Sequence, residues 1–160
     1  MTSRPNRSAV VTLLGPEAIL ELFEMRSVLE GFCFRIATEK VTSDQLDDIG
    51  SRIEALKKAQ SDLPTWSAMH DELHEYICSF STRHRLIENV RHLRHAVLPY
   101  IRLYLSTHES AEMQGFEHET LLKALAAGEP EASEKVMREH VMSAAMGVVD
   151  FVQSRHQPAK

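Results

Sequence analysis

Apolar residues recur at intervals of three and four positions along most of the chain, which is the period of an amphipathic helix. Between residues 16 and 39 the repeat runs through Phe23, Phe32, Cys33 and Ile36. No segment alternates apolar and polar residues in the way that a half-buried strand does. The pattern therefore predicts helices along nearly the whole chain.

Residues typical of helix ends divide this repeat into segments. Thr42 begins a capping-box signature, and Gly128 suits the position just after a helix. Pro16 and Pro130 suit a first helical turn, whereas Pro99 lies inside an apolar repeat and predicts a kink. The predicted helices span about residues 16–39, 42–60, 64–81, 84–104, 113–127 and 130–153.

Helices joined by short connections bury their apolar stripes against one another, so we predict an all-α fold, an antiparallel bundle of six to seven helices. Residues 1–14 begin with polar side chains and lack a helical repeat, and we expect a tail or the stub of a linker. Residues 15–156 are expected to form one helical domain. A chain of 160 residues, 43% of them hydrophobic, is long enough to bury a core of its own.

The composition argues against several classes of protein. A net charge of −5 is unfavourable for a module that binds nucleic acid directly. No apolar run reaches 18 residues and no signal-peptide core follows the first residues, so we predict neither a membrane span nor secretion. Cys33 and Cys78 lie in apolar helical patterns without a CxxC partner, which indicates buried thiols and favours a cytoplasmic protein.

Four of the nine histidines lie on apolar helix faces. His70 and His74 share one face because they are four residues apart, while His118 and His140 lie on apolar faces of two later helices. Imidazoles from three helices can meet inside a bundle, and nitrogen ligands suit a divalent transition metal such as Zn or Ni. The alternative for each is a core histidine satisfied by a hydrogen bond, although burying several together leaves many donors and acceptors to satisfy.

Other histidines carry less information. His92 and His95 lie with Arg91 and Arg94 on a face of the fourth predicted helix that we expect to be solvated. We assign no chemical role to this face.

Several stretches resemble one protein family. LFEMRSVLEGFCFRIA at residues 22–37, HDELHEYI at 70–77, EHETLLKALAAGEPEAS at 117–133 and MREHV at 137–141 are similar to the FCD ligand-binding domain of FadR-type GntR transcription regulators. The resemblance covers about residues 16–149. It implies an all-helical bundle that commonly dimerises, and an effector-sensing domain rather than an enzyme.

The resemblance also implies a metal site. Many members hold a divalent metal through an Asp, a His four residues later and two further His on later helices. The three histidines of that set fall on His74, His118 and His140 of this sequence. The position four before His74 is His70 instead of Asp, so either His70 completes the site or Asp71 takes its place, and we favour His70.

The effector that this reading implies is a small carboxylate metabolite, which a divalent cation and a guanidinium would bind together. Arg26 lies on an inward row, where its charge is costly unless paired, so it either binds the effector or forms a buried salt bridge with Glu30. Arg102 and Tyr104, which follow the predicted kink, are further candidates for lining the cavity.

Two rival functions stay open on sequence grounds. HDELH at residues 70–74 is similar to the HEXXH motif of zinc hydrolases, with Asp71 at the position of the general base. The other rival is a helical dimerisation module without a ligand.

We also expect a homodimer, because the first and fourth predicted helices hold surplus apolar residues, for example Leu20, Phe34, Leu98 and Leu103. A regulator of the family carries a winged helix-turn-helix, but only about 14 residues precede the first predicted helix. DNA binding is therefore expected only through a winged helix-turn-helix outside these residues.

Overall fold

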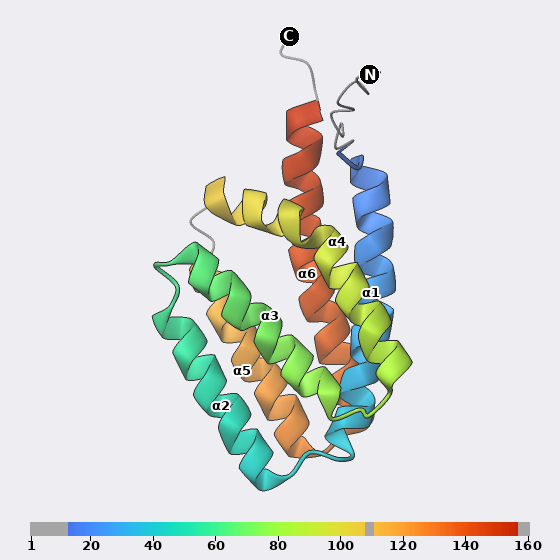
Figure 1. Cartoon of the computed structure of the whole chain (residues 1–160), viewed down its shortest axis with the longest axis vertical. Helices are drawn as coiled ribbons and strands as arrows, with labels where there is room; N and C mark the ends of the chain where they lie inside the picture. Colours follow the sequence, from blue (N-terminus) through green and yellow to red (C-terminus); the bar gives the residue numbers. More distant parts are fainter. Residues whose placement is uncertain (1–12, 108–110, 157–160) are drawn as a thin grey trace, which may run out of the picture.

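A computed structural model describes residues 13–107 and 111–156 of the chain (Figure 1). The described residues form helices and no strand, which confirms the prediction of an all-α bundle. The helices are α1 (Pro16–Thr38), α2 (Ser43–Lys58), α3 (Leu63–Ser79), α4 (His84–Thr107), α5 (Ala111–Ala127) and α6 (Pro130–His156). Most of the predicted tail, residues 1–12, lies outside the described residues.

Local chemistry accounts for the helix ends. Thr42 and Gln45 form a reciprocal capping box at the start of α2, and the Asp62 carboxylate accepts a hydrogen bond from the backbone N–H of Thr65 at the start of α3. Gly128 ends α5 with a φ of 69°, a left-handed conformation that glycine adopts without strain. Pro99 lies inside α4, and Figure 1 shows that the second half of this helix turns away from the first.

Consecutive helices run in opposite directions, and α1 lies beside α6 along the length of the bundle (Figure 1). This pair makes the most extensive helix contact in the described structure. The helices α2, α3 and α5 form the opposite side, and α4 packs against α1 and α3. The bundle therefore brings α3, α5 and α6, which carry the four singled-out histidines, around a shared interior.

Gly31 explains how closely α1 and α6 approach. A Cβ atom at this position would lie 2.5 Å from the Cγ atom of Arg138 and 3.2 Å from the backbone oxygen of Glu134, both on α6. A side chain is therefore excluded where the two helices cross.

The buried face of α1 differs from the sequence prediction at Phe32 and Phe34. Phe34, expected among the surplus surface residues, is fully buried, whereas Phe32, expected inside, is 44% exposed. Since α1 contacts α6, α4 and α3 at once, its buried face is wider than one stripe and includes Phe34. Both cysteines are buried free thiols, as predicted. None of the helices in the described part of the chain has the length and apolarity that a membrane crossing needs.

Candidate metal centre

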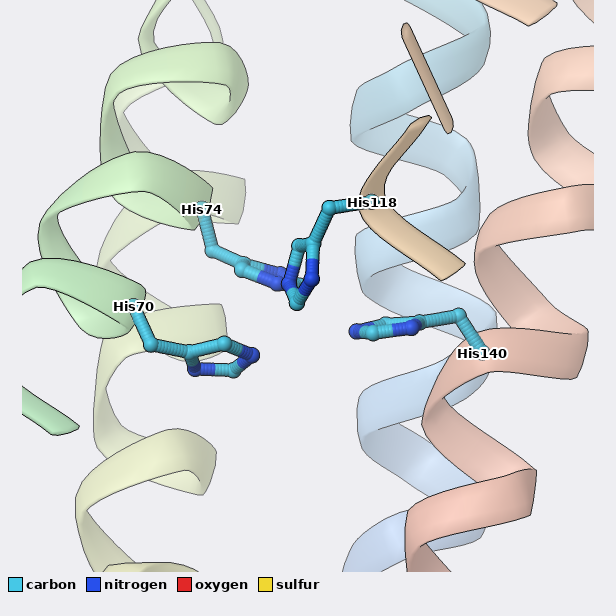
Figure 2. A group of neighbouring side chains, drawn as sticks. All are labelled: His70, His74, His118 and His140. Carbon is cyan, nitrogen blue, oxygen red and sulfur yellow. The ribbon is translucent and has the colours of Figure 1, made fainter. Parts of the chain in front are cut away.

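The four histidines predicted to face the interior do meet there. His74 and His118 are almost completely inaccessible, His140 is 8% exposed, and His70 is half-buried. One ring nitrogen from each lies within 4.8 Å of those of the other three. Figure 2 shows His70 and His74 projecting from α3 toward His118 on α5 and His140 on α6. Sequence spacing alone placed only the first two together.

The rings pack closely around this point. The ring centroids of His70 and His74 are 4.4 Å apart, and those of His118 and His140 are 4.9 Å apart. Trp66, one turn before His70 on α3, stacks on the His70 ring with a centroid distance of 4.9 Å and an interplanar angle of 24°. The tryptophan thus covers one face of His70 and fixes the plane of its ring.

The histidines of α3 are held in the neutral form. Burial keeps the pKa of His70 well below its ordinary value of 6.5, and the neighbouring imidazoles lower it further. Burial also keeps the pKa of His74 well below 6.5, with Arg94 adding to the effect. A neutral imidazole has a lone pair on one nitrogen, which is the form that binds a metal.

The donor chemistry of this group fits a divalent transition metal. Within the described residues, neither ring nitrogen of His74 makes a hydrogen bond, although the side chain is fully buried. Nitrogen ligands at about 2.0–2.1 Å from a tetrahedral ion lie about 3.3 Å apart, so the nitrogens, now within 4.8 Å of one another, would close in by at most about 1.5 Å. Four imidazoles suit Zn or Ni and not Mg or Ca. The group could therefore hold such an ion.

Asp71 pairs with Arg94 and does not join the histidine group. Its carboxylate and its backbone oxygen both accept hydrogen bonds from Nη2 of Arg94 on α4. The histidine group includes no oxygen of Asp71. Arg94, expected on a solvated face, is only 5% exposed, because α4 packs this residue against α3 and α1. Its neighbours His92 and His95 are exposed, as predicted.

Arg26 adopts the salt-bridge alternative. It is 3% exposed, and its Nε donates to Oε1 of Glu30 over 3.1 Å. Glu30 itself is fully buried, and burial alone would raise its pKa, but Arg26 and Arg94 outweigh this effect and lower it. Sequence reasoning treated Glu30 only as the partner of Arg26 and did not foresee that Arg94 and His74 also approach it.

The two other predicted effector residues lie in different places. Arg102 is exposed, and its Nε donates to the buried Ser67 hydroxyl over 3.3 Å, one turn before His70. Tyr104 packs edge-on against Phe151 of α6, with centroids 5.9 Å apart. Phe151 lies three helical turns beyond His140, so Tyr104 lies away from the histidine group.

A cavity of about 230 Å³ opens next to His140. His140 lines it together with residues of α5 and α6, which are Thr120, Val136, Glu139 and Ser143. This cavity gives an approach from outside to one member of the histidine group. The hydroxyl-bearing residues Thr120 and Ser143 were not singled out from the sequence, because periodicity does not show where a helix pair leaves space.

Comparison with protein families matches residues 21–143 to the FCD domain. The match covers most of the chain, and the protein belongs to the FCD family, the C-terminal domain of GntR/FadR-type regulators. No curated protein matches the chain closely enough to extend this comparison. FCD domains are regulatory domains that bind small-molecule effectors and are not typically catalytic, so the class of this protein is an effector-sensing regulatory domain.

Proposed function

We propose that this domain senses a small carboxylate metabolite through a divalent transition metal held by His70, His74, His118 and His140. The observation that carries the proposal is the convergence of one nitrogen from each of these side chains within 4.8 Å in the bundle interior. When bound, the ion supplies a concentrated positive charge to which a carboxylate is attracted. All four ligands would be neutral, so no ligand charge would offset that attraction.

Features around the histidine group support the binding of an anionic effector there. The cavity beside His140 provides an approach, and Thr120 and Ser143 provide hydroxyl groups there. Of the predicted arginines, Arg102 is the one we propose for the effector, since Arg26 is bonded to Glu30. Effector binding would favour one arrangement of the helices over another by its differential affinity for them.

The hydrolase alternative loses its general base in this arrangement. As a general base, Asp71 would have to face a water molecule bound to the metal, but its carboxylate is paired with Arg94 of α4 and is not part of the histidine group. We therefore propose no catalytic role for the HDELH segment.

Calorimetric titration of small di- and hydroxycarboxylates into Zn-loaded and metal-free protein tests the proposal. We expect binding only to the loaded form. His70→Ala should weaken metal and carboxylate binding together, Arg102→Gln should weaken carboxylate binding alone, and Asp71→Ala should leave both nearly intact. Loss of binding in Asp71→Ala but not in His70→Ala, or equal binding to the metal-free protein, would contradict the proposal.

We also propose that the domain forms a homodimer. Three large apolar side chains, Met25, Val28 and Phe32, lie at helical spacing along α1 and are 44–49% exposed. An exposed stripe of this kind is typical of an interface.

A further inference from the structure

Glu30 on α1 is a buried carboxylate surrounded by side chains from three helices. It is fully inaccessible, and Arg26 contacts both its oxygens, with Nε 3.1 Å from Oε1 and Nη2 3.5 Å from Oε2. Nε of Arg94 lies 3.4 Å from Oε1, and Nδ1 of His74 lies 3.4 Å from Oε2. The carboxylate therefore lies directly behind one member of the histidine group.

The charge state of Glu30 determines whether its carboxylate accepts or donates a hydrogen bond at His74. Two buried guanidinium groups lie against this carboxylate, with Nε of Arg26 3.1 Å and Nε of Arg94 3.4 Å from Oε1, and this pairing stabilises its ionised form. An ionised carboxylate can only accept hydrogen bonds. This carboxylate, with Oε2 3.4 Å from Nδ1 of His74, therefore favours the tautomer whose hydrogen is on Nδ1.

A neutral imidazole carries one hydrogen on one of its two nitrogens, and only the other can bind a metal. If the hydrogen lies on Nδ1, the lone pair lies on Nε2. A carboxylate behind a histidine commonly fixes the ring and its tautomer in this way in metal sites.

We propose that Glu30 is a positioning residue for the histidine group, holding the hydrogen of His74 on Nδ1 so that Nε2 is the ligand atom. This inference rests on the proposed metal-binding function. It assigns to α1, which contributes no histidine to the group, a direct part in setting up the site.

A purely structural role for Glu30, as the counter-ion of two buried arginines, makes a different prediction. It would affect folding stability but leave the tautomer and the metal affinity unchanged. Asp71 provides the matched control, because it also pairs with Arg94 but lies outside the histidine group. Glu30→Gln preserves the shape of the side chain, and Asp71→Asn makes the same chemical change at the control position.

The experiment measures the histidine tautomers of the full chain by long-range ¹H–¹⁵N correlation without metal, and the affinity for Zn²⁺ by competition with a chelator. We expect the wild type to carry the His74 hydrogen on Nδ1. In Glu30→Gln the tautomers should mix and the Zn²⁺ dissociation constant should rise about 10- to 100-fold. In Asp71→Asn the tautomer should be unchanged and the dissociation constant should change less than about threefold.

Two results would overturn the inference: a wild-type His74 with its hydrogen on Nε2, or a Glu30→Gln variant that keeps both the wild-type tautomer and the wild-type Zn²⁺ affinity. If the wild type bound no Zn²⁺, the proposed function would fail, but the metal-free tautomer would still decide the role of Glu30. If Glu30→Gln did not fold, the wild-type spectrum alone would decide it.

Discussion

Trp66 stacks on His70, with 4.9 Å between the ring centroids. It is the only tryptophan of the chain, so its fluorescence reports on this histidine. We predict that Ni²⁺ quenches the emission and that quenching saturates near one equivalent, because a bound paramagnetic ion would lie next to the stacked pair. A fluorescence titration checks this, with His140→Ala expected to abolish the effect and the exposed His92→Ala expected to preserve it. Quenching that is the same in all three proteins would contradict the assignment.

The depressed pKa values of His70 and His74 predict how the metal-free protein responds to pH. Unfolded histidines take up protons near pH 6.5, whereas these two do so only at lower pH when folded. The stability that these two neutral histidines contribute to the folded state is therefore fully present above about pH 6.5. It is lost as the pH falls toward the folded pKa values, and the free energy of unfolding drops by up to about 1.4 kcal/mol per pH unit for each group.

Urea unfolding in the presence of a chelator, repeated between pH 7.5 and 5, measures this dependence as the free energy of unfolding. His74→Gln should flatten the profile, and His92→Ala should not. A wild-type profile without a slope between pH 6.5 and 5 would be inconsistent with neutral buried histidines.

The close approach of α1 and α6 at Gly31 predicts a cost for adding a methyl group. Gly31→Ala should lower the free energy of unfolding by about 1 kcal/mol, because overpacking against Glu134 and Arg138 outweighs the gain in helix propensity. Gly50 on α2 is the control, since a Cβ there would only make an ordinary contact, 3.5 Å from Leu122. Gly50→Ala should be neutral or stabilising, and an equal effect at both positions in denaturant titrations would refute the packing argument.

The exposed stripe on α1 predicts the state of association. We expect light scattering at tens of micromolar to give the mass of a dimer for the wild type and of a monomer for Val28→Glu, because a buried, unpaired carboxylate opposes association. Met146→Glu on α6 changes an exposed apolar residue outside the stripe and should remain dimeric. A monomeric wild type would remove the basis for the homodimer.

Much of the fold could be predicted because local chemistry determines the helix ends. The capping box at Thr42 and Gln45, the left-handed Gly128 and the internal Pro99 all act within a few residues of chain, and each was confirmed. The exchange of Phe32 and Phe34 could not be predicted, since it depends on which helices surround α1. The periodicity of one helix does not contain that information.

The candidate site could likewise be predicted only in part. Helical spacing placed His70 beside His74, and the apolar faces of α5 and α6 placed His118 and His140 inside. The burial of Arg94 and its contacts with Glu30 and Asp71 depend on how α4 crosses α1 and α3. Those contacts could not be predicted from the spacing of residues along any single helix.

The most direct test of the central claim is the metal content of the purified protein, measured by elemental analysis after removal of loosely bound ions. We predict about one Zn or Ni per chain in the wild type and in His92→Ala. The variants His118→Ala and His140→Ala should lose most of this metal. They should also melt at a lower temperature, because the ion stabilises the folded state to which it binds. Full metal content in both interior variants, or only traces of metal in the wild type after incubation with Zn²⁺, would contradict the account.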